Sequence, residues 1–231
     1  EEHRLLKSAK LNVVNPGQTV DFGAMKVEFI RTTHSIPDAC SLAIHTPVGV
    51  VVHTGDFKID YTPIDGEMMD FGRLAELGNR GVLALMSDST NSERKGYTMS
   101  ESTVGEVLDK LFINCTKRIV VATFSSNVHR VQQIVNSVKY GRKVAICGRS
   151  MINTIETARK FGYIKVPDNI FIDIDMIKSY PDDRLTIITT GSQGETMSAL
   201  TRMASGEHRK VQITPNDLII ISANPIPGNE N

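Results

Sequence analysis

The sequence predicts an α/β protein with a β-rich first part and a second part built on a mainly parallel sheet. Three observations lead to this prediction. The first part alternates apolar and polar residues around glycine-containing turns, and the second alternates short apolar runs with helical patterns. Hydrophobic residues make up 40% and charged residues 23% of 231 positions, a balance typical of globular proteins with a core. We expect two domains, at residues 1–80 and 81–231.

The first part is predicted to consist mainly of antiparallel strands. Residues 10–34 contain two stretches of apolar–polar alternation that read as paired strands. Residues 41–47 and 49–57 predict a further hairpin, which turns at Pro47–Gly49. A polar crossover then leads to a helix near residues 70–81.

In the second part, strand and helix patterns alternate. A capping box starts the first helix, from Ser100 to Thr103 or from Ser102 to Glu106. Short apolar strands joined by helices predict a parallel sheet with both faces covered. The expected strands are 82–90, 118–124, 143–148, 185–191 and 217–225, and the expected helices are 100–114, 125–141, 150–162 and 194–206.

The segments that follow these strands are candidates for a binding site. Ligands of open parallel sheets bind beyond the carboxyl ends of the strands. These segments are rich in Ser, Thr, Asn, Gly and Arg, which bind phosphate oxygens. Each segment alone could be a helix cap, but five at one edge favour a phosphate-binding rim. The segments are 87–91, 124–130, 147–151, 189–195 and 222–230.

One class of phosphate-binding protein is excluded. The glycines of "GSQGE" (191–195) are not followed by Lys-Ser or Lys-Thr, so this is not a P-loop. Charge leaves two interpretations open. Lys+Arg and Asp+Glu number 26 each, but ten cations between Lys117 and Lys165 are interrupted by a single acid, Glu156. This run is either a solvated basic face or a surface for a phosphate backbone.

The cysteines and apolar runs indicate a cytoplasmic protein. Cys40, Cys115 and Cys147 are widely spaced and form no CxxC pair, which is typical of reduced thiols. The longest apolar runs have strand length, so no membrane span is expected, and the opening residues do not resemble a signal peptide.

His34 and Asp56 are candidate metal ligands. They are 22 residues apart and lie at the ends of predicted strands, where a rigid scaffold can fix ligand geometry. Spacing alone makes this a weak signal. Asp88 follows a predicted strand and could simply cap a helix. His45 and His53 lie within the alternating strands, where packing or surface roles are expected.

Seven short segments together resemble the ribonuclease J family, metallo-β-lactamase proteins with an inserted β-CASP domain. They occur in the family's order and cover nearly the whole chain. By this resemblance, residues 1–80 are part of a metallo-β-lactamase domain. Residues 81–231 are a β-CASP domain, incomplete at its C-terminal end, and the chain is an internal fragment. The segments are "THSIPDA" (33–39), "HTGDFKID" (53–60), "SDSTN" (87–91), "FSSNVHR" (124–130), "GRSM" (148–151), "TTGSQGE" (189–195) and "PIPGNE" (225–230).

The resemblance implies metal-dependent RNA hydrolysis, both endonucleolytic and 5′-to-3′ exonucleolytic, in rRNA processing and mRNA decay. It implies two zinc ions, with manganese or magnesium as alternatives, and RNA with a 5′ monophosphate as partner. A homo-oligomer or a complex of paralogues is also expected.

The resemblance also assigns residues. His34 and Asp56 match metal ligands, and Asp56 and Asp88 match catalytic acids. Ser125, Ser126 and Asn127 match a phosphate site. Beside this site, the predicted rim supplies further candidates, which are His129, Arg130, Arg149, Ser192 and Gln193.

The departures from the family pattern are equally informative. The His-x-His-x-Asp-His motif is absent, because no two of the six histidines are separated by one residue. Only two usual ligands remain, so we expect this chain alone to be inactive. Three alternatives stay open: a catalytically silent RNA-binding paralogue, a hydrolase of the same superfamily for a small ester or a thioester, and a generic α/β domain whose rim residues only cap helices.

Overall fold

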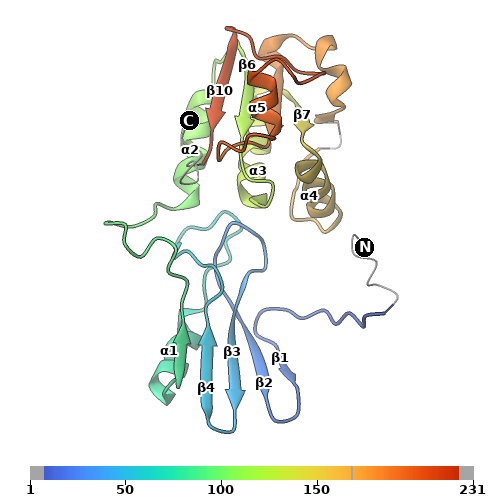
Figure 1. Ribbon diagram of the computed structural model, residues 1–231. Helices are drawn as coiled ribbons and strands as arrows, with labels where there is room; N and C mark the ends of the chain where they lie inside the picture. Colours follow the sequence, from blue (N-terminus) through green and yellow to red (C-terminus); the bar gives the residue numbers. More distant parts are fainter. Residues whose placement is uncertain (1–7, 168, 224–231) are drawn as a thin grey trace. The chain divides into compact units, whose positions relative to one another are not determined.

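The computed structural model describes residues 8–167 and 169–223, which divide into two compact units (Figure 1). Unit 1 comprises Glu1–His34 and Asp38–Met99, and unit 2 comprises Ser35–Pro37 and Ser100–Asn231. The "PIPGNE" segment at 225–230 lies outside the described residues.

Unit 1 contains sheet A, with strand order β1-β2-β3-β4-β5. The first four strands pair antiparallel, as the alternation predicted, whereas β5 pairs parallel with β4. The expected boundary at 80/81 had put β5 in the second domain. The units divide at Met99/Ser100 instead, because β5 completes sheet A. The strands are β1 (Thr19–Asp21), β2 (Lys26–Arg31), β3 (Cys40–Thr46), β4 (Gly49–His53) and β5 (Ala84–Met86).

Helix α1 (Phe71–Arg80) packs on one face of sheet A. Asp70 caps this helix, since its carboxylate accepts a hydrogen bond from the Arg73 N–H at 2.9 Å. Leu77 of α1 packs on apolar side chains of three strands to form the core of the unit, namely Ile30, Ala43 and Val52. On the other face, four apolar side chains stay partly exposed, namely Val27, Phe29, Leu42 and Ile44.

Unit 2 contains sheet B, an entirely parallel sheet with strand order β10-β6-β9-β7-β8. This confirms the mainly parallel sheet predicted from the strand–helix alternation. The short strand β8 was not expected. The strands are β6 (Arg118–Ala122), β7 (Lys143–Cys147), β8 (Phe171–Ile172), β9 (Leu185–Thr189) and β10 (Asp217–Ile221).

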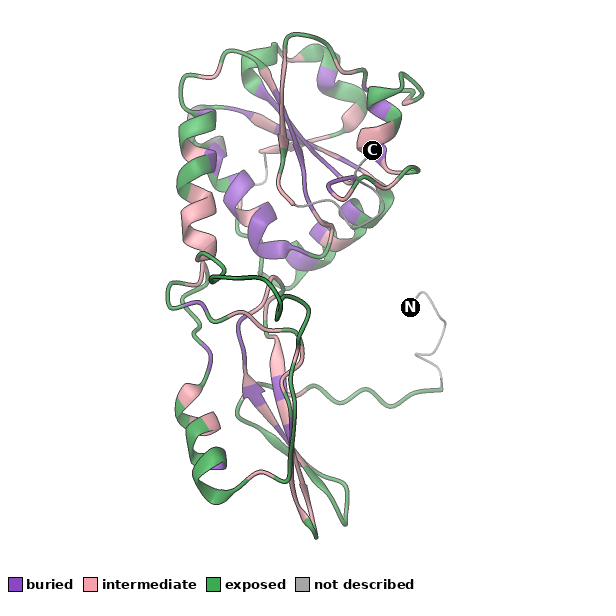
Figure 2. Ribbon diagram, turned by 60° about the vertical axis from the view of Figure 1, so that its left-hand side comes forward, coloured by how far each residue is buried: buried purple, intermediate pink, exposed green. Residues whose placement is uncertain are grey.

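Helices cover both faces of sheet B. Helices α2 (Glu101–Phe112), α3 (Val128–Asn136) and α4 (Arg149–Lys160) pack on one face. Helix α5 (Ala199–Ala204) and the 3₁₀-helix η3 (Ile174–Ser179) pack on the other. Figure 2 shows that the buried residues concentrate in the strands of this sheet and in α3. None of the helices in the described residues is long and apolar enough to cross a membrane.

Two short 3₁₀-helices complete unit 2, η2 (Ser137–Tyr140) and η4 (Asp182–Arg184). The chain leaves β6 through α3 on one face and leaves the adjacent β9 through α5 on the other. The connections therefore diverge between β6 and β9. In open α/β sheets, this divergence opens a crevice at the carboxyl ends of the strands, where ligands bind.

Candidate functional site

The loop after β4 leaves the Asp56 side chain exposed. The Thr54 N–H donates to the Met86 carbonyl at 3.0 Å. Gly55 has a φ of 60°, and a Cβ at this position would lie 3.2 Å from the Cys40 carbonyl oxygen. Glycine is therefore the residue that this turn accepts without strain. The turn at Gly55 sets the backbone position of Asp56.

His34 lies beside this loop. The Lys58 N–H donates to the Thr33 carbonyl at 2.8 Å, and the Thr33 hydroxyl hydrogen-bonds to the Lys58 carbonyl. These bonds hold the segments on either side together, and His34 Nε2 lies 3.9 Å from Asp56 Oδ2. The two predicted metal ligands are neighbours in the structure.

Asp88 approaches the same place from β5. Its N–H donates to the Thr54 hydroxyl at 3.0 Å, and its carboxylate accepts hydrogen bonds from the Thr90 N–H at 2.9 Å and hydroxyl at 2.7 Å. These bonds from Thr90 lower the pKa of Asp88, and the Phe57 N–H and the charge of His34 lower it further. Asp88 therefore stays a carboxylate beside His34 and the Asp56 loop.

These residues fit part of a metal site. His34 offers an imidazole nitrogen and Asp56 a carboxylate oxygen, both of them common zinc ligands. A catalytic zinc needs three protein ligands. Over residues 8–167 and 169–223, no group of three or more His, Cys, Asp or Glu side chains is placed to hold a metal. The described residues therefore supply two candidate ligands, fewer than a catalytic zinc site needs.

The other two histidines of sheet A have structural contacts. His45 Nε2 lies 3.2 Å from Glu28 Oε2, and His53 Nδ1 accepts a hydrogen bond from the Gly55 N–H at 3.0 Å. Both contacts agree with the packing and surface roles expected from the alternating pattern.

In unit 2, the predicted phosphate rim lies at the carboxyl ends of β6 and β9. The two ends touch, since the Thr123 N–H donates to the Thr189 carbonyl at 3.1 Å. The residues predicted after β6 and after β9 therefore share one edge of sheet B, at the point where the connections diverge. They are Ser125, Ser126 and Asn127 after β6, and Ser192 and Gln193 after β9.

Two buried hydroxyls at this rim lack a hydrogen-bond partner among the described residues. Thr123 is 0% and Ser192 3% exposed, and neither hydroxyl has a hydrogen-bond partner within the described part of the chain. An unpaired buried hydroxyl costs about 1–3 kcal/mol. Sequence reasoning missed Thr123, although a polar residue at the end of a buried strand was a usable signal.

The N-terminus of α4 reaches the same edge from β7. No side chain caps this helix, and Arg149 in its first turn is exposed. Gly148 precedes it with a φ of 113°, and a Cβ there would lie 3.0 Å from the Thr190 hydroxyl. An open helix N-terminus with an exposed arginine suits an anion.

Asn127 and Arg130 make hydrogen bonds within the protein that stabilise unit 2. The Asn127 side chain caps α3 by accepting a hydrogen bond from the Arg130 N–H at 2.9 Å. The Arg130 guanidinium, 8% exposed, donates to Glu101 at 2.7 Å and also to Ser222. His129 is buried beside it on α3. These contacts position the rim, and direct phosphate contacts by His129 and Arg130 remain predictions.

The basic run between Lys117 and Lys165 does not form one face. Six of its ten cations are engaged in contacts within unit 2, and they come from β6, α3, η2, the start of β7 and α4. A strand–helix–strand segment distributes its side chains around the fold, which a linear count of charges cannot show. The contacts are Arg118 with Asp217, Arg130 with Glu101, Lys139 with Asp109, Arg142 with backbone carbonyls, Lys143 with the Asn169 carbonyl and Arg159 with the Phe171 ring.

Comparisons with known proteins agree with the resemblance seen in the sequence. Residues 116–231 match the family described as "Ribonuclease J, beta-CASP domain". The chain is 52% identical to a ribonuclease J of Synechocystis sp. and 50% identical to one of Helicobacter pylori, covering 99% and 100% of this chain but 36% and 34% of those proteins. It is 43% identical to ribonuclease J2 of Bacillus subtilis, over 97% of this chain and 40% of that protein.

The chain thus spans about a third to two-fifths of the curated relatives it matches. A crystal structure of a protein of unknown function from Enterococcus faecalis shares the fold, with a TM-score of 0.56 and 19% identity. The match covers 78% of this chain and 45% of that one.

Proposed function

We propose, from the premise that this chain belongs to the ribonuclease J family, that it forms part of a metal-dependent ribonuclease. It contributes two metal ligands and a phosphate-binding rim, and alone it is inactive. The observation that carries this proposal is the convergence of His34, Asp56 and Asp88, which three separate segments of unit 1 bring to one place. Unit 1 corresponds in this proposal to part of a metallo-β-lactamase domain.

Each residue of the convergence has a role. His34 and Asp56 hold metal, with zinc as the first choice and manganese or magnesium as alternatives. Bound metal supplies an activated water and offsets negative charge at the scissile phosphate. Asp56 and Asp88 are the acids assigned to catalysis. Asp88 keeps its negative charge because Thr90 hydrogen-bonds to it, and it favours the orientation of the neighbouring His34.

The rim of unit 2 binds the sugar–phosphate backbone. Hydroxyls, amides and an open helix N-terminus contact phosphate without reading bases. The uncapped N-terminus of α4 and the exposed Arg149 in its first turn support this role, since both favour a bound anion. The residues proposed for contact are Ser125, Ser126, Asn127, His129, Arg130, Arg149, Ser192 and Gln193.

For the whole protein, we propose RNA with a 5′ monophosphate end as substrate, cut by endonucleolytic and 5′-to-3′ exonucleolytic hydrolysis in rRNA processing and mRNA decay. A cytoplasmic location and a homo-oligomer or a complex of paralogues belong to the same proposal. These points rest on the family resemblance.

A second candidate is a catalytically silent RNA-binding paralogue. The observation that favours it is that no group of three or more His, Cys, Asp or Glu side chains among the described residues is placed to hold a metal. The retained pair and Asp88 favour the enzyme, because a subunit that only binds RNA has no need of them.

Binding and turnover of a short labelled RNA by this chain test the proposal. RNA with a 5′ monophosphate or a 5′ hydroxyl is titrated with zinc or manganese over a salt series. We expect salt-sensitive binding that prefers the 5′ phosphate, without cleavage. Ser192→Ala should weaken binding about fivefold, as the loss of one hydrogen bond does, whereas Lys110→Ala, an exposed lysine on α2, should leave it unchanged.

Two results would contradict parts of the proposal. Absence of binding at every salt concentration would reduce the rim to helix caps. Cleavage that a chelator abolishes would show that the chain alone carries a complete metal centre.

A further inference from the structure

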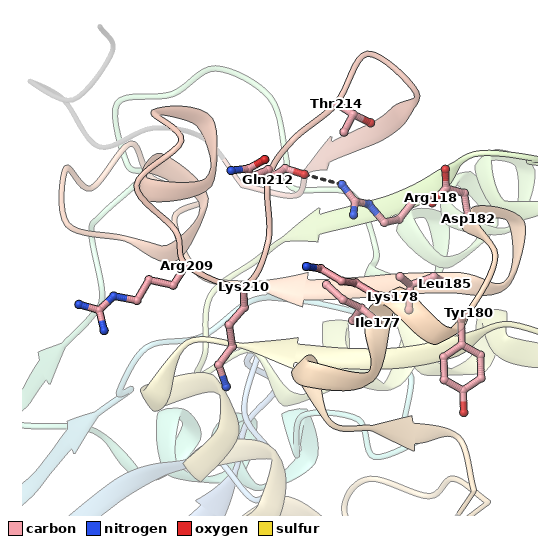
Figure 3. Close-up of a pocket in the computed structure, with 10 residues that line it drawn as sticks. All are labelled: Arg118, Ile177, Lys178, Tyr180, Asp182, Leu185, Arg209, Lys210, Gln212 and Thr214. Atoms are coloured by element: carbon pink, nitrogen blue, oxygen red, sulfur yellow. Dashed lines mark hydrogen bonds between the residues drawn. The ribbon is translucent and has the colours of Figure 1, made fainter.

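At the amino ends of the sheet B strands, opposite the rim, lies a second polar site. A pocket of about 440 Å³ opens here (Figure 3). Its walls come from three distant segments: the start of β6, the stretch from η3 to the start of β9, and the approach to β10. The lining residues are Arg118, Ile177, Lys178, Tyr180, Asp182, Leu185, Arg209, Lys210, Gln212 and Thr214.

The walls are held in place by contacts that need no ligand. Arg118 binds Asp217 through two nitrogens at 2.7 and 2.6 Å and donates to the Gln212 carbonyl at 2.7 Å. Lys210 binds Asp175 of η3 at 2.8 Å, which ties the approach to β10 to the opposite wall. Pockets that bind small molecules are largely preformed in this way.

The charge of the pocket favours an anion. Four of its ten lining residues are cationic, and Asp182 is its only acid. Arg118 and Lys210 have carboxylate partners, Asp217 and Asp175. Lys178 and Arg209 are different: both are exposed, and neither side chain has a hydrogen bond or ion pair with the residues that the structure describes.

The directions of the side chains single out one cation. In Figure 3, Lys178 extends from η3 toward the 209–212 segment, between Arg118 and Lys210, whereas Arg209 points outward. Lys178 is therefore the cation available to a ligand in the pocket. Gln212 and Thr214 offer neutral polar groups, and the buried side chains of Ile177 and Leu185 form an apolar floor.

Size narrows the class of ligand. Small-molecule sites have volumes of roughly 300–1,000 Å³, and this pocket falls within that range. This volume is larger than a lone phosphate ion needs. β6 and β9 have five residues each, so the pocket and the rim lie on the order of 15 Å apart along the strands.

We propose that this pocket binds a small phosphate monoester of mononucleotide size, with its phosphate group on Lys178. The site is separate from the rim and does not depend on RNA binding there.

The test is a titration of the full chain with adenosine 5′-monophosphate, followed by amide chemical shifts in NMR spectra. Inorganic phosphate and adenosine are titrated in parallel. We expect shifts at residues 177–185 and 209–214, and affinity for the monophosphate should exceed that for either fragment. Lys178→Ala should weaken binding at least about tenfold, as expected for a lost charge-assisted hydrogen bond, and Lys178→Arg should retain it.

Lys110→Ala is the matched control, because Lys110 is an exposed lysine on α2, outside the pocket. Unchanged affinity in Lys178→Ala, or adenosine bound as well as its monophosphate, would overturn the proposal. Inorganic phosphate bound as tightly as the monophosphate would also overturn it. Shifts confined to residues 123–130 and 189–193 would place binding at the rim, support that proposed function and overturn this one. If RNA binds at the rim but the monophosphate does not bind in the pocket, the proposed function of the rim stands and the proposal for the pocket is overturned.

Discussion

Sheet A and sheet B bury their strands in different ways. Every residue of β9 in sheet B is buried, because helices cover both faces. In sheet A, α1 covers one face, and apolar side chains such as Phe29 and Ile44 stay partly exposed on the other. Unit 2 therefore depends on a large apolar core, whereas unit 1 depends more on a few core contacts and on polar networks.

The largest effect is expected in the core of unit 2. Ile187 is 0% exposed in β9, and Ile187→Ala should destabilise unit 2 by about 2–5 kcal/mol through lost burial and a cavity. Hydrogen exchange measured by mass spectrometry should show reduced protection in β6, β7 and β9. Ile44→Ala, on the partly exposed face of sheet A, is the matched change and should cost less. An equal loss of protection in sheet A after Ile187→Ala would show that the two units do not unfold separately.

The loss of a buried cation at the amino edge of sheet B should have the next largest effect. Arg142 is 1% exposed and binds four backbone carbonyls, those of Cys115, Lys117, Asp182 and Leu185. Arg142→Met would leave these carbonyls without their donor and should cost about 2–4 kcal/mol.

The same exchange experiment measures this effect, with Lys143→Met as the control, since Lys143 makes a single exposed contact with the Asn169 carbonyl. If amide exchange is the same in Arg142→Met and Lys143→Met, the four hydrogen bonds of Arg142 stabilise unit 2 no more than the single contact of Lys143 does.

In unit 1, the corresponding polar network is smaller. Arg73 binds Glu28 through Nε at 2.6 Å and Nη2 at 2.9 Å, and His45 lies against the same carboxylate. Glu28→Gln should destabilise sheet A by about 1–3 kcal/mol, because these bonds are charge-assisted. Exchange in β2 and β3 measures the loss. Glu67→Gln is the control, since Glu67 is exposed where it pairs with Arg31.

This network also predicts the pH dependence of unit 1. The hydrogen bond from Arg73 lowers the pKa of Glu28 below its value in the unfolded chain. Its contribution is therefore present above the unfolded pKa and is lost as pH falls through the lower folded value. Protection in sheet A should decline in acid from about pH 4 downward, and Glu28→Gln should flatten this decline. A decline unaltered in the variant would assign the acid sensitivity to other groups.

The smallest effect is expected at the start of α1. Asp70→Ala removes the N-cap and should cost about 1 kcal/mol, whereas Asp70→Asn should retain most of it. Exchange in the first turn of α1 distinguishes the two variants. Equal protection in both would show that the cap is dispensable.

Local pattern was enough for most of the fold. The alternation of apolar runs and helical patterns predicted β6, β7, β9 and β10 with their helices, because each element carries its own period. β5 was assigned to the wrong unit because its partner, β4, is set by tertiary pairing that no local pattern encodes. The two-residue β8 is too short to have a period.

The candidate sites show the same limit. His34, Asp56 and Asp88 were named from motifs, but their convergence depends on backbone bonds between Thr33 and Lys58 and between Asp88 and Thr54. The pocket at the amino edge was missed entirely, since its walls come from three segments separated by dozens of residues. Arg130 looked available for phosphate because its partner Glu101 belongs to another helix.

The hydrogen bonds from Arg142 to four backbone carbonyls have a consequence for how this part of the protein responds to salt. This guanidinium is buried, and no carboxylate among the described residues pairs with it. Two of the carbonyls it binds belong to Asp182 and Leu185, which line the pocket. Mobile ions cannot reach a charge enclosed in this way, so salt screens it far less than it screens an exposed lysine. The hydrogen bonds by which Arg142 holds the Asp182 and Leu185 carbonyls in the pocket wall should therefore persist at salt concentrations that screen exposed ion pairs.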